Sequence, residues 1–131
     1  MEQKVFESQR LGERYTQIRH PSGLTLLLYP MEGFHNAFVS LTTNYGSVDS
    51  QFRINGQWVT VPQGIAHFLE HKLFESEEGD AFEQYAKTGA DANAFTSFAQ
   101  TSYLFTVTDH FQESFEILLN LVTKPYFTKE T

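Results

Sequence analysis

The sequence predicts an α+β fold in which helices pack on a mostly antiparallel sheet. Strand-like segments separated by turn residues occupy the first half of the 131 residues. Two stretches with helical spacing follow, and two more strand-like segments then precede a last helical stretch. An order of strands, two helices, two strands and one helix is typical of helices packed on an antiparallel sheet rather than of alternating βαβ units.

Turn residues mark the ends of the first predicted strands. Residues 14–19 and 24–29 flank a turn at 20–23 (His-Pro-Ser-Gly), which is the pattern of a hairpin. Residues 36–45 form a further strand, with one face made by Phe38, Ser40 and Thr42 and the other by Val39, Leu41 and Thr43. Residues 49–60 contain a turn at Asn55-Gly56, so we expect a loop or a small hairpin there.

The helices and the later strands follow from periodicity and capping residues. A helix is expected over 65–75, with Ile65, Phe68, Leu69 and Leu73 on its apolar side. A second is expected over 80–88, with Asp80 and Glu83 resembling a capping box and Gly89 as the C-cap. Strands are expected over 91–98 and 102–108. A last helix should begin at Asp109, bury one face and end at Lys124-Pro125; that face carries Phe111, Phe115, Leu118, Leu119 and Val122.

Length and composition indicate one domain over residues 1–131 with enough apolar residues for a packed core. Apolar residues make up 40% of the chain, which is too many for a disordered segment. The net charge of −7 and the pI near 5.1 argue against nucleic acid or an anionic membrane surface as the main partner. The chain has no cysteine, which excludes disulfides, thiolate metal ligands and a cysteine nucleophile.

The sequence lacks signs of export or membrane insertion. The first residues, Met-Glu-Gln-Lys, do not form the apolar stretch of a signal peptide. No segment approaches the roughly 18 consecutive apolar residues of a membrane span. We therefore expect a cytoplasmic protein.

The segment His67-Phe68-Leu69-Glu70-His71 carries the clearest chemical signal. Residues three and four apart share one face of a helix, so His67, Glu70 and His71 can meet at one point. Two imidazoles beside a carboxylate can bind zinc and activate water, and H-x-x-E-H is the pattern of the inverted zinc peptidases. The alternative is an amphipathic core helix with two histidines on its polar face.

Beyond this motif, the chain resembles the pitrilysin (M16) family of zinc peptidases from about Gly23 to Phe127. Four blocks carry the resemblance, in the family's order. They are residues 64–74 (GIAHFLEHKLF), Gly89 with residues 93–97 (NAFTS), residues 103–105 (YLF), and the helix that ends at residues 125–127 (PYF). Residues 67–75 (HFLEHKLFE) are most similar to the corresponding segment of bacterial processing proteases.

The resemblance implies roles for individual residues. His67 and His71 correspond to zinc ligands and Glu70 to the general base. Asn93 and Ala94 correspond to a cleft strand that holds a peptide or small protein substrate by strand addition. For Thr96 and Ser97, a functional role and an ordinary place in the strand both remain open. The acidic residues Glu75, Glu77, Glu78 and Asp80 are interpreted as a solvated connection rather than a second metal site.

The resemblance also implies parts that this sequence does not contain. The family's third zinc ligand is a glutamate that would fall near position 148, beyond Thr131, because Glu113 and Glu116 come too early. The family also uses a second, similar domain or a second subunit. The chain is thus expected to be an N-terminal piece of such a protein. Alone it should hold zinc weakly and show little or no peptidase activity. The face that would meet the second domain should be exposed, so we also expect self-association into a homo-oligomer.

Two other functions fit part of the sequence. One is a non-catalytic partner subunit of an M16-type complex, although inactive members usually lose motif residues and all three are present here. The other is a metal-dependent lyase of the S-ribosylhomocysteinase type, which also carries H-x-x-E-H. That lyase uses a cysteine as its third ligand, and this chain has none.

Overall fold

The computed structural model describes residues 1–129, which fall into two compact units. The first unit, Met1–Phe34, is a three-stranded antiparallel sheet of β1 (Glu2–Ser8), β2 (Glu13–Arg19) and β3 (Thr25–Leu28) in the order β1-β2-β3. The predicted hairpin of β2 and β3 is confirmed, whereas β1 was not predicted. Glu2–Ser8 pairs along the whole of β2, and the rings of Phe6 and Tyr15 stack with centroids 5.0 Å apart. The expectation of a single domain over 1–131 stays a prediction.

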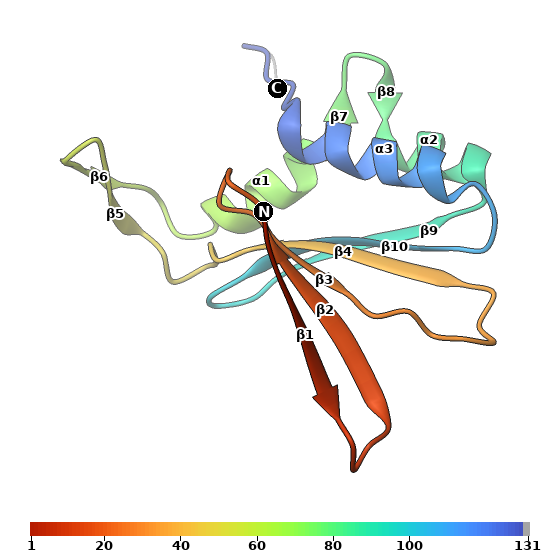
Figure 1. Cartoon of the computed structure of the whole chain (residues 1–131). Coiled ribbons are helices and arrows are strands. Elements are labelled where there is room, and N and C mark those ends of the chain that lie inside the picture. The colour runs from red at the N-terminus through yellow and green to blue at the C-terminus, as the bar shows by residue number, and fades with distance from the viewer. Residues whose placement is uncertain (130–131) are drawn as a thin grey trace. The chain divides into compact units, whose positions relative to one another are not determined.

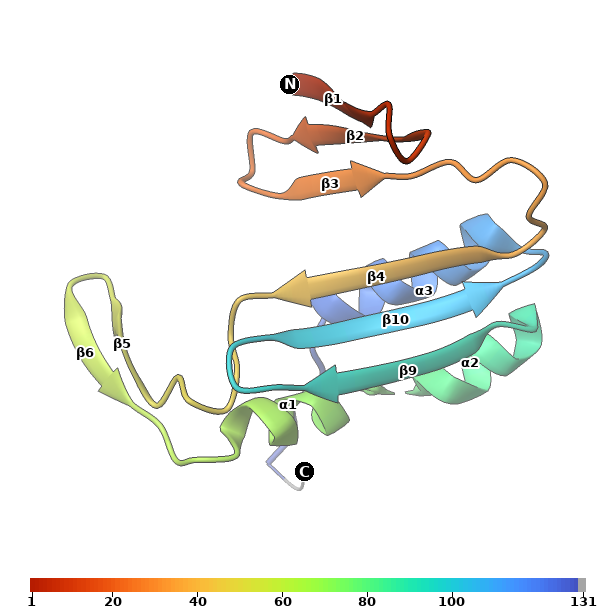
Figure 2. The ribbon, with the colours of Figure 1, turned by 90° about the horizontal axis from the view of Figure 1, so that it is seen from below.

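The second unit begins at His35 and is built on another three-stranded antiparallel sheet. Its strands are β4 (Ala37–Thr43), β9 (Asp91–Thr96) and β10 (Thr101–Val107), and β10 lies between the other two (Figure 2). In the register, Tyr103 of β10 lies opposite Leu41 on one side and Ala94 on the other. The side chains at these three positions therefore share one face of the sheet.

The helices of the second unit cover that face. They are α1 (Ile65–Leu73), α2 (Ala81–Thr88) and α3 (Phe111–Thr123), and all three lie on the same side of the sheet (Figure 1). The core between the layers is largely aromatic and aliphatic, with Phe74, Ala81, Tyr85, Tyr103, Phe105, Val107, Leu118 and Leu121 at its centre. The predicted α+β fold, a mostly antiparallel sheet with helices packed on it, is confirmed.

The predicted ends of α2 are confirmed. Asp80 is extended and its carboxylate accepts the N–H of Phe82 at 2.8 Å, which satisfies one of the free donors at the helix start. Gly89 adopts a left-handed conformation (φ 76°) as the C-cap.

Helix α1 ends earlier than predicted, and its buried side differs in part from the prediction. It ends at Leu73, and Glu75–Ser76 forms a two-residue strand, β7, that pairs with β8 (Gly79–Asp80). Phe68, expected in the core, is 53% exposed. Ile65 and Leu69 are half-buried and Leu73 packs on the core, as predicted, but the helix also turns Ala66 and Glu70 inward. A carboxylate thus lies on the buried side of the helix.

Helix α3 begins after His110 and buries most of the predicted face. Leu118 is buried and Phe115 and Val122 pack on the core, as expected. Phe111 is 47% exposed, however, and Ser114 and Leu121 are buried as well. Ser114 is accommodated because its hydroxyl donates to Thr88 Oγ1 at 2.9 Å, which ties α3 to α2. A hydrogen-bonded serine can therefore occupy the centre of a helix interface.

The segment 49–60 forms the small hairpin that was one of its two expected forms. Its strands are β5 (Gln51–Ile54) and β6 (Gln57–Thr60), and in both views it extends away from the sheet (Figures 1 and 2). The Arg53 guanidinium lies 4.7 Å from the centre of the Trp58 ring. Among residues 1–129, no helix has both the length and the apolar character needed to cross a membrane.

Candidate metal centre

Helix α1 places the two motif histidines one turn apart. Gly64 adopts φ 90°, a conformation that glycine reaches without strain, and its carbonyl accepts the N–H of Phe68 at 2.9 Å. From this start, His67 and His71 lie on one exposed side of the helix. Their Nε2 atoms are 3.1 Å apart and their rings meet at 79° with centroids 4.6 Å apart.

This arrangement fits a zinc ion. In a tetrahedral site with Zn–N bonds near 2.0–2.1 Å, two ligand nitrogens lie about 3.3 Å apart. The observed 3.1 Å between the two Nε2 atoms is close to that spacing. Ligand atoms of His67, Glu70 and His71 all lie within 4.8 Å of one another, and within residues 1–129 these three form the one such group that could hold a metal ion. The donor set, two imidazoles and a carboxylate, is also one that zinc favours.

Glu70 differs from the histidines because it is buried. The residue is only 6% exposed, and its Oε2 lies 3.6 Å from Nδ1 of His67. The hydroxyl of Thr96, on β9, donates a hydrogen bond to the same oxygen. Tyr103 lies in the same buried region. Burial, with a smaller contribution from the charge of Glu70, raises the pKa of Tyr103 to about 12. The motif carboxylate is therefore held between the helix and the sheet.

The two residues proposed to hold substrate, Asn93 and Ala94, lie on strand β9. This strand pairs with β10 on one side only, and its other edge pairs with no strand among the described residues. Helix α1 contacts β9 from the helix-covered face of the sheet (Figures 1 and 2). The N–H of Ala94 donates to the Asn93 side-chain oxygen at 2.8 Å. Since that N–H bonds to a side chain of its own strand, we infer that it points to the open edge rather than into the ladder with β10. Asn93 is exposed, whereas Ala94 is half-buried against the helices.

A contact that the sequence did not reveal secures the end of β9. The N–H of Ser47 donates to the carbonyl of Ser97 at 3.0 Å, and that of Val48 donates to the carbonyl of Phe98 at 3.1 Å. Gly46 packs so closely on this turn that no side chain fits there. No local pattern in the sequence indicates this contact, because packing between distant segments leaves none.

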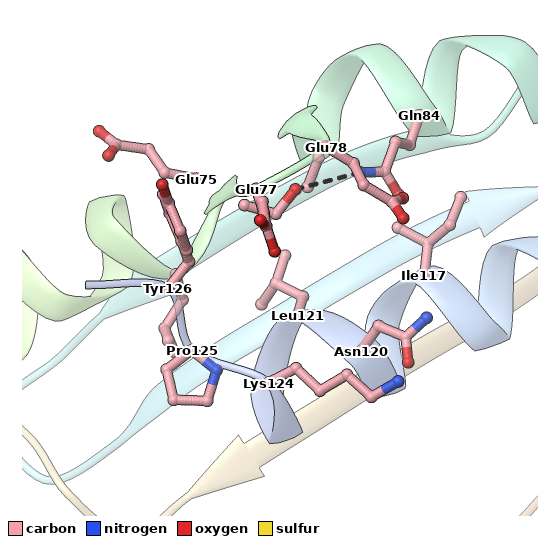
Figure 3. A pocket seen from close by; sticks show the side chains of 13 residues that line it. Glu75, Glu77, Glu78, Gln84, Ile117, Asn120, Leu121, Lys124, Pro125 and Tyr126 are labelled. Atoms are coloured by element: carbon pink, nitrogen blue, oxygen red, sulfur yellow. Dashed lines mark hydrogen bonds between the residues drawn. The ribbon is translucent and has the colours of Figure 1, made fainter. Parts of the chain in front are cut away.

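The acidic residues after α1 lie apart from the motif. Glu75 pairs with the buried Lys72 at 2.7 Å, whereas Glu77 and Glu78 are exposed. Together they border a cavity of about 320 Å³ that also touches the end of α3 (Figure 3). None of the three motif residues lines this cavity. The interpretation of these residues as a solvated connection agrees with their exposure and with the capping role of Asp80.

Comparison with known proteins agrees with the fold and the motif. Residues 60–131 match the family model described as insulinase (peptidase family M16). The zinc protease YmfH of Bacillus subtilis is 45% identical over 130 residues, covering 98% of this chain and 30% of that protein. The structure of an M16-like peptidase from Alicyclobacillus acidocaldarius superposes with a TM-score of 0.84 at 40% identity, over 88% of this chain and 27% of the other.

A third similarity concerns the fold alone. Pitrilysin superposes with a TM-score of 0.75 at 22% identity, over 95% of this chain and 13% of that structure. Fold, motif and family match together define a zinc metallopeptidase family, and the chain belongs to peptidase family M16. It spans about 30% of the length of YmfH.

Proposed function

We propose that this chain forms the zinc-binding part of a metalloendopeptidase that hydrolyses peptide bonds. One observation carries the proposal: the Nε2 atoms of His67 and His71 lie 3.1 Å apart beside the buried carboxylate of Glu70. The family membership and the zinc-protease names of relatives support it. The residues present fit a zinc ion, which would supply Lewis-acid activation of water and of the scissile carbonyl when bound.

The proposed roles divide between the exposed and the buried residues. His67 and His71 would hold the ion through Nε2, since these are the two nitrogens that converge. Glu70 would act as the general base: its carboxylate takes a proton from water as the water oxygen adds to the carbonyl carbon. As the C–N bond breaks, Glu70 returns that proton to the departing amine. Its burial removes competing water and keeps the carboxylate in one orientation.

Substrate would be held at the open edge of β9. A peptide laid along that edge as an added strand would bond to the free backbone groups of the strand, including Ala94 N–H. In the absence of substrate, that N–H donates to Asn93 Oδ1 at 2.8 Å, so peptide binding would displace the Asn93 side chain. Asn93 would then be free to bond to the peptide itself.

Full activity is proposed for the larger polypeptide. We infer that a third zinc ligand and a second domain or subunit come from outside residues 1–131, because two imidazoles leave a catalytic zinc short of its usual three protein ligands. Residues 1–131 are proposed to act as one domain in that protein, and its cytoplasmic location and self-association remain proposals.

The proposed function is tested with the natural polypeptide that carries this chain. Cleavage of a quenched peptide library would be measured with and without a zinc chelator, for the wild type and for Glu70→Gln. We expect cleavage that stops with the chelator and in Glu70→Gln, while the variant keeps its zinc. If the folded, zinc-loaded wild type cleaves no peptide, the chain is instead a non-catalytic partner subunit.

A further inference from the structure

We propose that Thr96 is the residue that positions the Glu70 carboxylate, a role that rests on the proposed function. The hydroxyl of Thr96 donates a hydrogen bond to Glu70 Oε2 across 26 positions of sequence. It joins the sheet to the helix at the one buried acidic side chain of the motif. Glu70 is buried and Thr96 is half-buried, so the hydrogen bond between β9 and α1 is largely shielded from solvent.

The burial of Glu70 makes this hydrogen bond consequential. A carboxylate that is 6% exposed has few water molecules to orient it, so its protein donors decide how it sits. The Thr96 bond and the 3.6 Å contact with His67 Nδ1 both fall on Oε2. With Oε2 held, a proton from water would be taken by Oε1. Without the Thr96 hydroxyl, the carboxylate could turn about its last side-chain bond and lose this preference.

Strand β9 holds Thr96 rigidly enough to act as a positioning group. Its partner in the register is Thr101, whose hydroxyl donates to the Tyr45 carbonyl at 2.7 Å. The next residue, Ser97, closes the turn to β10 through its N–H and the Gln100 carbonyl at 2.8 Å. Its own carbonyl accepts the Ser47 N–H. These bonds fix the backbone around Thr96 and therefore the position of its hydroxyl.

The kinetic test replaces only the hydroxyl. Thr96→Val keeps the branched shape and removes the donor, and Thr96→Ser keeps the donor. In the natural polypeptide, we expect Thr96→Val to lower kcat about 10- to 100-fold, the range for losing a hydrogen bond to a charged group. KM and bound zinc should stay as in the wild type, and Thr96→Ser should keep most of kcat. Thr42→Val is the matched control, since it loses the threonine hydrogen bond to Ser102 on the same sheet, away from both Thr96 and Glu70.

Two kinetic results would overturn the proposal. One is a kcat for Thr96→Val within about twofold of the wild type. The other is an equal loss of kcat in Thr96→Ser or in the control Thr42→Val, because either would assign the effect to packing rather than to the donor.

A second measurement does not depend on catalysis. The unfolding midpoint in urea would be compared for the chelator-treated wild type, Thr96→Val, Glu70→Met and the double variant. If the hydrogen bond exists, the double variant loses less stability than the two single variants together. Additive losses would overturn the proposal. A wild type that cleaves nothing but shows this coupling would contradict the proposed function and leave the hydrogen bond standing.

Discussion

Gly46 should be among the least replaceable residues of the second unit. A Cβ added there would lie 2.6 Å from the backbone nitrogen of Ala99 and closer still to the carbonyl of Phe98. Both belong to the turn that follows β9, which has no flexible side-chain end that could move aside. Gly46→Ala must therefore separate the loop after β4 from this turn.

The cost of that separation can be worked from the contacts. Overpacking against backbone costs about 1–3 kcal/mol. The bonds Ser47 N–H to Ser97 and Val48 N–H to Phe98 span the two segments, and each contributes about 1 kcal/mol. Losing both gives a total of about 3–5 kcal/mol, a large part of the 5–15 kcal/mol typical of a whole domain.

Urea unfolding followed by circular dichroism measures this loss. Gly56→Ala is the control, because Gly56 has φ 79° and open space around it, so only backbone strain of about 1–2 kcal/mol is expected there. The reasoning predicts a clearly larger loss for Gly46→Ala. A loss no greater than that of the control would refute it, since the close approach of the two segments would then have no energetic consequence.

Two further predictions concern the core. Ser114→Ala should cost about 1–2 kcal/mol in urea unfolding, because it removes the buried bond to Thr88 and leaves a small void; unchanged stability would contradict the inferred link between α2 and α3. Burial raises the pKa of both Tyr85 and Tyr103 to about 12. In the unfolded chain the same side chains ionise near pH 10, so between pH 10 and 12 they are neutral only in the folded protein. Stability should therefore be independent of these groups below pH 10 and fall as the pH rises from 10 to 12. Phenolate absorbance of the native protein that titrates entirely near pH 10 would contradict this.

Much of the fold could be predicted because local chemistry decided it. Alternation set the faces of β4: Val39 and Leu41 pack on the core and Phe38 is exposed. Asp80 and Gly89 fixed the ends of α2 through capping, which depends only on neighbouring residues. Strand β1 was missed because its residues are mostly exposed and polar, so that only its pairing with β2 reveals it.

The inward faces of two helices could be predicted only in part, for a shared reason. Hydrophobic periodicity assumes that polar residues face water, yet Glu70 and Ser114 are buried because Thr96 and Thr88 provide hydrogen bonds. Such partners lie far away in sequence and give no local signal. The same limit applies to the candidate site. The H-x-x-E-H spacing predicted that three residues converge, but only the structure shows that Thr96 joins them.

The most direct test of the central claim is zinc binding by this chain. Equilibrium dialysis would measure zinc bound to the wild type, to His67→Ala, to His71→Ala and to His110→Ala. The last is a matched control, since His110 Nδ1 lies 3.9 Å from Glu113 with the same i,i+3 spacing as His67 and Glu70. At a zinc concentration that saturates this weak site, we predict about one zinc ion per chain in the wild type and in His110→Ala, and strongly weakened binding in the other two. Equal binding by all four proteins would contradict the assignment of His67, Glu70 and His71 as the metal centre.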